Sequence, residues 1–207
     1  MNQTKQLTTA EQRILDALHE HGGYIRTGDI LQAGMDHHAL ARLTERGLLE
    51  RVRRGLYRRA DMISADVTVA DVAAAAPDGV ICLLSALSHY ELTTTTPWDV
   101  YLAIPRKAWA PKIDYPPVRV VFYTDSMFVY GIRDEPLSTG RTVRMYSPEK
   151  SMADAFHFEG YAGRDIALEA LKTYMARRKE RNIPALLKAA EVCKVRSTMQ
   201  QYLEALA

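Results

Sequence analysis

The chain has 207 residues, enough for one large domain or two small ones. Apolar residues make up 47% of the chain and charged residues 25%, which excludes a disordered, collagen-like or low-complexity protein. The formal net charge is +2 at pH 7, so the whole chain is not a polycation. Its two cysteines, Cys82 and Cys193, lie far apart. That separation excludes a disulfide scaffold or a cysteine-cluster zinc site and suits a reducing cytoplasm.

The sequence gives no sign of membrane insertion or export. The first residues are polar, and no apolar run approaches the roughly 20 residues that a transmembrane helix needs. A signal-peptide core is also absent from the sequence. We therefore expect a cytoplasmic protein that does not contact a membrane.

Spacing of apolar and capping residues predicts three helices in the first part of the chain. Thr9 is expected to cap the first helix, with Gln12 completing a capping box, and a Gly-Gly pair follows the helix. A short extended segment, Tyr24-Ile25, comes next. Thr27 is expected to cap the second helix, and Asp36 the third.

A basic hairpin is predicted directly after the third helix. Residues 48–53 and 56–59 alternate apolar and basic side chains on either side of Arg54-Gly55, as in two strands joined by a tight turn. Three helices followed by such a hairpin are typical of a winged helix-turn-helix, in which the third helix enters the major groove and the hairpin forms the wing. We therefore expect a DNA-binding domain over residues 1–62.

Positive charge is concentrated in this unit. Between Arg42 and Arg59 the chain carries seven arginines and two glutamates, so this segment has a charge of +5 and the remainder −3. Charge focused on a helix and a wing favours nucleic-acid binding, although a solvated hairpin face is the alternative. The predicted DNA-contacting residues are His37, His38, Arg42, Arg46, Arg51, Arg53, Arg54 and Arg58.

The second half, residues 66–207, is predicted to be a mixed α+β domain that ends in a helical tail. Its size is sufficient for a core of its own. The fold class is therefore α+β, with an N-terminal winged helix-turn-helix. Helices are expected from Thr68 to the Ala73–Ala76 run, within 80–92, and over 148–158, 164–178, 184–193 and 197–206, and strands over 98–104, 118–123 and 142–146.

No catalytic or cofactor motif is complete. Ser85, His89 and Asp99 suggest a hydrolase, but Ser85 is not flanked by the glycines of a nucleophile elbow. Asp99 alone cannot hold the metal ions of a nucleotidyltransferase site, which needs paired carboxylates. The histidines match no metal-site spacing. We therefore predict no enzyme activity, no metal and no cofactor. A proline-rich stretch with Trp109 and Tyr115 is either a partner-contacting loop or a rigid surface loop.

The combined order of motifs resembles the AbiEi-type antitoxins of type IV toxin–antitoxin and phage-abortive-infection systems. Matching segments run through nearly the whole chain, and they include residues 22–25, 40–43, 49–58, 81–88, 102–105, 117–121, 143–154 and 167–171. The paired histidines at 37 and 38 depart from the family, whose recognition helix starts with a stretch rich in Ser, Thr and Arg. This departure affects the expected operator sequence and leaves the expected fold unchanged.

The resemblance implies two roles. The winged helix would bind inverted repeats in double-stranded promoter DNA and repress its own operon. The C-terminal domain would counter a nucleotidyltransferase-like toxin encoded beside it, without forming a stable complex. The alternative is a winged-helix transcriptional regulator whose ligand-sensing or enzyme-like C-terminal domain is unrelated to toxins.

Overall fold

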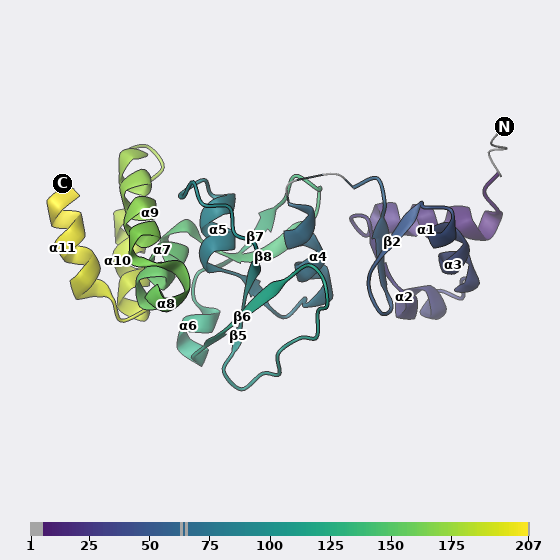
Figure 1. The fold of residues 1–207 in the computed structure, drawn as a ribbon, viewed down its shortest axis with the longest axis horizontal. Coiled ribbons are helices and arrows are strands. Elements are labelled where there is room, and N and C mark those ends of the chain that lie inside the picture. Colours follow the sequence, from purple (N-terminus) through teal and green to yellow (C-terminus); the bar gives the residue numbers. More distant parts are fainter. Residues whose placement is uncertain (1–5, 63, 65, 207) are drawn as a thin grey trace.

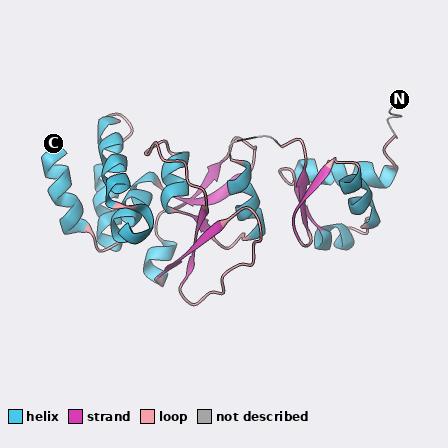
Figure 2. Cartoon of the chain, viewed as in Figure 1, coloured by secondary structure: helices cyan, strands magenta, loops and turns pink. Residues whose placement is uncertain are grey.

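The computed structural model describes residues 6–62, 64 and 66–206. Three parts follow one another along the longest axis: a small N-terminal unit, a β-sheet with helices on both sides, and a bundle of C-terminal helices (Figure 1). Helices dominate both ends, and the larger sheet occupies the middle (Figure 2). This is the predicted α+β class. Within the described residues, no helix is long and apolar enough to cross a membrane.

The N-terminal unit has the predicted winged helix-turn-helix order. Helices α1, α2 and α3 enclose a core of aliphatic side chains, among them Ile14, Leu18 and Leu43, all completely buried. Strand β3 lies in the middle of an antiparallel three-stranded sheet of order β1-β3-β2. The elements are α1 (Thr9–Glu20), β1 (Tyr24–Arg26), α2 (Thr27–Gln32), α3 (His38–Glu45), β2 (Leu49–Arg53) and β3 (Leu56–Arg59).

The first helix begins one residue earlier than the predicted cap. Thr8 is the N-cap, and its hydroxyl accepts a hydrogen bond from the Glu11 backbone N–H at 3.3 Å. Glu11 reciprocates by accepting the Thr8 backbone N–H at 2.8 Å. A glutamate completes such a box better than Gln12 because its carboxylate also interacts favourably with the helix dipole. Thr27 likewise is not the cap of α2, whose N-cap is Arg26.

The central sheet of the second part has the strand order β6-β5-β4-β8-β7 and mixes parallel with antiparallel pairs. Side chains of β5 alternate between two cores. Tyr101 and Ala103 face the core beneath the C-terminal helices, whereas Leu102 and Ile104 face the core beneath α4. The strands are β4 (Val80–Ile81), β5 (Val100–Pro105), β6 (Val118–Tyr123), β7 (Ile132–Pro136) and β8 (Thr142–Tyr146).

Most of the predicted C-terminal helices are present, with small shifts at their ends. The helix predicted within 80–92 is α5, which starts at Leu83 because Val80 and Ile81 form a strand that pairs with β5 and β8. Thr68 lies inside α4 and does not cap it. The helices are α4 (Val67–Ala75), α5 (Leu83–His89), α6 (Asp125–Val129), α7 (Pro148–His157), α8 (Glu159–Ala162), α9 (Arg164–Ala176), α10 (Ile183–Val192) and α11 (Arg196–Leu206).

An ion pair is enclosed where α7 meets the sheet. Lys150 and Asp154 are both completely buried and bond to each other. The Lys150 ammonium also lies 4.3 Å from the centre of the Tyr146 ring and 4.8 Å from that of Tyr123. The Cys193 thiol, just after α10, donates to the same carboxylate at 3.3 Å. This cluster connects α7 to the sheet and to the helical tail.

Replacing Lys150 alone should therefore destabilise the C-terminal domain strongly. The Lys150→Met variant leaves the Asp154 carboxylate without its cation, and breaking a buried pair in this way costs about 3–5 kcal/mol. The free energy of unfolding in urea measures the loss. The double variant Lys150→Met/Asp154→Leu removes both charges and should lose much less. An equal loss in both variants would contradict the importance of the pair.

Candidate nucleic-acid interface

The third helix presents one face to solvent and the other to the core, as predicted. Leu40 and Leu43 are buried against α1 and the three-stranded sheet β1-β3-β2, called the wing sheet below. His38, Ala41 and Glu45 are exposed on the opposite side. In a helix-turn-helix the exposed face of this helix is the one that meets base edges. The fold thus leaves this face open for a DNA duplex.

At the start of α3, one carboxylate organises the exposed side chains. Asp36 accepts the His38 backbone N–H at 2.9 Å with one oxygen and the Arg42 guanidinium at 3.0 Å with the other. The hydrogen bond from Arg42 holds the pKa of the Asp36 carboxyl below its usual range. The rings of His37 and His38 lie 4.1 Å apart and are both exposed. These contacts orient Arg42 and the helix N-terminus before any ligand arrives.

Asp36, His37 and His38 also bring three potential metal ligands within 4.8 Å of one another. However, both oxygens of Asp36 are already engaged by the His38 N–H and by Arg42. A metal ion would have to displace the guanidinium and would then lie beside its positive charge. The geometry therefore favours an arginine-positioning role for Asp36.

Glu11 connects the first helix to the third. Its buried carboxylate lies 3.0 Å from the Arg46 Nη1 and 3.5 Å from the Arg42 Nε. The hydrogen bond from the Thr8 backbone, assisted by Thr8 Oγ1 and the two arginines, lowers the pKa of the Glu11 carboxyl. Arg42 and Arg46 are thus held by carboxylates inside the domain, although both are predicted DNA contacts.

The wing carries two openly exposed arginines. Arg51 lies on β2, and Arg54 lies in the turn between β2 and β3. Gly55 completes this turn with φ of +77°, a conformation that glycine adopts without the steric cost of a Cβ. An irregularity in the pairing between Arg51 and Arg53 twists the end of the hairpin. Both exposed guanidinium groups can therefore approach a phosphate backbone.

Arg53 and Arg58 point elsewhere. Arg53 is half-buried and lines a cavity of about 470 Å³ together with Trp109 from the proline-rich loop. The Arg58 side chain is only 13% exposed, bonds to Glu50, and lies 3.3 Å from Asp71 on α4. The structure thus brings together His37, His38 and Arg42 on one element and Arg51 and Arg54 on another, while Arg58 faces the C-terminal domain.

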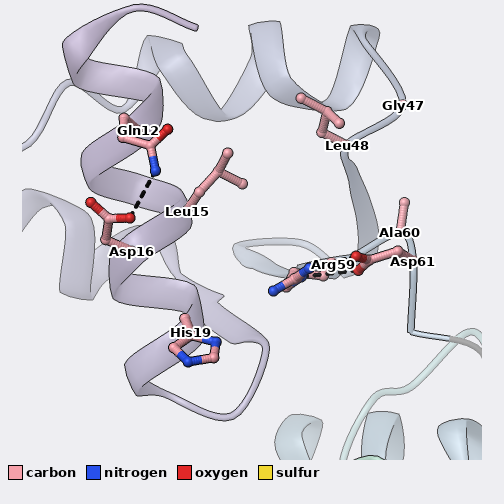
Figure 3. Close-up of a pocket in the computed structure, with 9 residues that line it drawn as sticks. All are labelled: Gln12, Leu15, Asp16, His19, Gly47, Leu48, Arg59, Ala60 and Asp61. Carbon is pink, nitrogen blue, oxygen red and sulfur yellow. Dashed lines mark hydrogen bonds and ion pairs between the residues drawn. The ribbon is translucent and has the colours of Figure 1, made fainter.

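A cavity of about 340 Å³ lies on another side of the N-terminal unit, between α1 and the residues that follow the wing (Figure 3). Four of its polar groups pair with each other: Gln12 donates to Asp16 at 2.8 Å, and Arg59 donates twice to Asp61. These pairs neutralise the charges of Asp16, Arg59 and Asp61 in part, and His19 is a further polar group of the cavity. Its walls are formed by Gln12, Leu15, Asp16, His19, Gly47, Leu48, Arg59, Ala60 and Asp61.

The residues considered for hydrolysis have structural partners. Ser85 is buried, and its hydroxyl oxygen accepts the Tyr101 backbone N–H at 2.9 Å, which fastens α5 to β5. Asp99 pairs with Arg119 at 3.0 Å. Both contacts give these side chains a role in holding the sheet together.

Sequence reasoning missed the acidic residues that hold the arginines. Glu11 could have been found from the Thr8-x-x-Glu11 capping pattern, which matches the threonine–glutamate form of the box. Asp71, in contrast, lies on α4, outside the winged helix, and no local pattern links it to Arg58.

Comparisons with known proteins agree with this geometry. The model of a family described as "Transcriptional regulator, AbiEi antitoxin" matches residues 12–60, which confirms the resemblance over the helix-turn-helix and the wing. A crystal structure of the RV2827C protein from Mycobacterium tuberculosis is similar in fold, with a TM-score of 0.60 and 14% identity over 96% of this chain and 82% of that one. No curated protein matches the sequence.

The lowered pKa of Glu11 predicts an acid-sensitive contribution to stability. The contribution is fully present above the ordinary carboxyl value of 4.5 and disappears as the pH falls through the lower folded-state pKa. The Glu11→Gln variant should unfold at a lower temperature than the wild type at pH 7, and the difference should shrink below pH 4.5. Glu20→Gln, an exposed change on the same helix, is the control. A difference that stays constant down to pH 3 would contradict this role.

Proposed function

We propose, starting from the AbiEi antitoxin match over residues 12–60, that this protein is a DNA-binding antitoxin that represses its own operon. Its partner is a nucleotidyltransferase-like toxin from a type IV abortive-infection system, encoded beside it and countered without a stable complex. It acts in the cytoplasm and is not an enzyme. Its ligand is double-stranded promoter DNA with inverted repeats.

One observation carries the DNA-binding part of this proposal. The unit that the family model matches is a winged helix-turn-helix with the exposed face of α3 and the exposed arginines of the wing both free of packing. A helix in the major groove and a hairpin along the backbone are the usual way in which this motif binds DNA. The local charge of +5 between residues 42 and 59 supplies the attraction to phosphate.

The predicted contacts divide into two kinds. His37, His38 and Arg42 lie at the start of α3, where side chains reach base edges, so we assign them to sequence recognition. Arg51 and Arg54 lie on the wing and are assigned to phosphates. Arg46 and Arg53 are proposed as flanking contacts to the DNA backbone. For these contacts Arg46 would have to move away from Glu11, and Arg53 out of the cavity that it lines with Trp109.

Arg58 is the weakest of the predicted contacts. Two carboxylates already neutralise its guanidinium, and its side chain is 13% exposed. Contact with a phosphate would require the loss of both partners. We therefore exclude Arg58 from the proposed DNA surface.

A second function is favoured by a specific cavity in the C-terminal domain. It encloses about 790 Å³ and is lined by Ser88, His89, Trp98 and Tyr115, among others. Pockets of this size with mixed polar and aromatic walls hold small ligands. The alternative is thus a winged-helix regulator that senses a small molecule. Toxicity of the neighbouring gene, relieved by this protein, would favour the antitoxin.

Loss of a wing arginine should reduce the salt dependence of DNA binding. Each phosphate contact contributes about 0.9 to the slope of log K against log salt concentration. The Arg54→Ala variant should therefore bind promoter and unrelated DNA more weakly by similar factors, with a slope lower by about 0.9. Fluorescence anisotropy over a series of salt concentrations measures the slope.

Arg178→Ala is the matched control, because Arg178 is an exposed arginine outside the winged helix. It should leave both affinity and slope unchanged. An Arg54→Ala variant with the wild-type slope would show that the wing does not contact phosphate. A changed preference between promoter and unrelated DNA would instead place Arg54 at a base edge or in a narrow minor groove.

The two domains should have separable roles. The double variant Arg42→Ala/Arg54→Ala should lose repression of the native promoter but still protect cells when toxin and antitoxin are expressed from unrelated promoters. The reason is that repression limits the toxin supply only through the native promoter. Residues 1–65 alone should not protect. Colony counts under induced toxin expression measure protection.

Two results would contradict this division. One is protection by residues 1–65 under unrelated promoters. The other is loss of protection by the double variant while that variant remains folded and abundant. In either case neutralisation would not reside in the C-terminal domain, and the ligand-sensing regulator would become the better explanation.

A further inference from the structure

One face of the wing sheet packs on the rest of the protein and is not exposed to solvent. Tyr24 from β1 and Leu56 from β3 are 4% and 2% exposed, and they share a core with Ala70, Val72 and Ala74 of α4. The same helix packs on the larger sheet through Ile81, Leu102 and Met145. Helix α4 therefore has the wing sheet on one side and the central sheet on the other.

A buried carboxylate lies at the centre of this contact. Asp71 is 4% exposed, accepts the Tyr24 hydroxyl at 2.7 Å, and lies 3.3 Å from the Arg58 Nε. Burial raises the pKa of the Asp71 carboxyl, and the bonds from Tyr24 and Arg58 oppose that rise. A carboxylate in such a place is costly unless its partners remain, so the charge ties α4 to both strands.

Two further contacts fix the same orientation. The Arg26 guanidinium, at the start of α2, donates to the Ala74 carbonyl at 2.6 Å. That carbonyl belongs to the last turn of α4, where no later N–H of the helix can reach it and where a cation is favoured. The Arg141 guanidinium lies 4.8 Å from the centre of the Tyr24 ring.

We propose that Asp71 is a positioning residue for DNA binding, acting through Arg58 and Tyr24. It docks the wing sheet on α4, so that the C-terminal domain sets the orientation of α3 and the wing. Arg58 then contributes to operator affinity by holding the domain and not by touching DNA. This inference rests on the proposed function, but the docking itself can be measured without DNA.

The physical basis is pre-organisation. The proposed operator has inverted repeats, so two winged helices must meet two half-sites at a fixed spacing. A winged helix on a loose tether must be oriented for this at the moment of binding, and this ordering lowers the affinity. A docked domain is already ordered in the free protein, so binding loses less conformational entropy. Breaking the dock should therefore weaken operator binding without removing a single phosphate contact, because Arg51 and Arg54 lie at the other edge of the hairpin.

The test measures docking first. Spin labels at Glu20→Cys on α1 and Lys172→Cys on α9 occupy exposed positions, whereas the native Cys82 and Cys193 are buried and will not label. The labelled protein should show one narrow distance distribution. Asp71→Asn and, separately, Tyr24→Phe should broaden it. Asp165→Asn, an exposed change on α9, should not.

Operator affinity is measured next, on the same variants. Asp71→Asn should bind about tenfold more weakly, and its salt slope should equal that of the wild type. The triple variant Tyr24→Phe/Arg58→Met/Asp71→Leu replaces the buried polar group with apolar side chains, an exchange that buried ion pairs tolerate. It should restore both the narrow distribution and the affinity, although it lacks Arg58.

Three results would overturn the proposal. They are an unchanged distance distribution in Asp71→Asn and Tyr24→Phe, a broadened distribution with unchanged operator affinity, and a triple variant that docks but binds weakly with a reduced salt slope. The last would make Arg58 a DNA contact. Absence of operator binding by the wild type would instead refute the proposed function, and the distance distributions would still decide whether Asp71 docks the domain.

Discussion

Helix α4 packs on two β-sheets at once, and the arrangement of the whole chain depends on that double contact. Its alanines and valines are small enough to bring the wing sheet and the central sheet close on either side. The one charged side chain of α4, Asp71, is satisfied by Tyr24 and Arg58 from the wing sheet. Without this helix, the N-terminal unit would be joined to the rest by the connection that follows Asp61, by the contact of Arg141 with Tyr24, and by the neighbouring Arg53 and Trp109.

Several arginines of the N-terminal unit are matched by carboxylates, whereas the two exposed arginines of the wing are not. Glu11 serves Arg42 and Arg46, while Asp71 and Glu50 serve Arg58. Arg51 and Arg54 remain exposed on the wing. A count of basic residues along the sequence therefore overstates the charge that is available to a polyanion, because pairing inside the domain has already used part of it.

Sequence reasoning worked where the signal is local. The order of helices and hairpin, the buried face of α3 and the strands at 118–123 and 142–146 follow from periodicity and turn residues, and the structure confirms them.

Sequence reasoning failed where the partner of a residue is distant in the sequence. Strand β4 was not predicted because the pairing of Val80 with Ala103, and of Ile81 with Leu102 and Met145, is invisible in the sequence. Strand β7 was missed because Arg133, Asp134 and Glu135 lie on an edge strand, where charged side chains break the apolar alternation. The sequence likewise gives no sign that Arg58 pairs with Asp71 of α4.

Pairing of the α3 arginines has a consequence for specificity. A guanidinium held by a carboxylate gains little from a non-specific phosphate, because it exchanges one anion for another. It gains more from a site that offers a well-oriented pair of acceptors, such as a guanine edge, while the carboxylate stays nearby.

Arg42, held between Asp36 and Glu11, is in this position. Arg54 has no such restraint and suits general attraction to the DNA backbone. Under the proposed function, the same fold would separate attraction, carried by the exposed wing, from discrimination, carried by a restrained arginine on the recognition helix. The wing and α3 share one core, which includes Leu43 and Leu49, so they can contact one duplex together as a rigid unit, and the dock on α4 orients that unit relative to the rest of the chain.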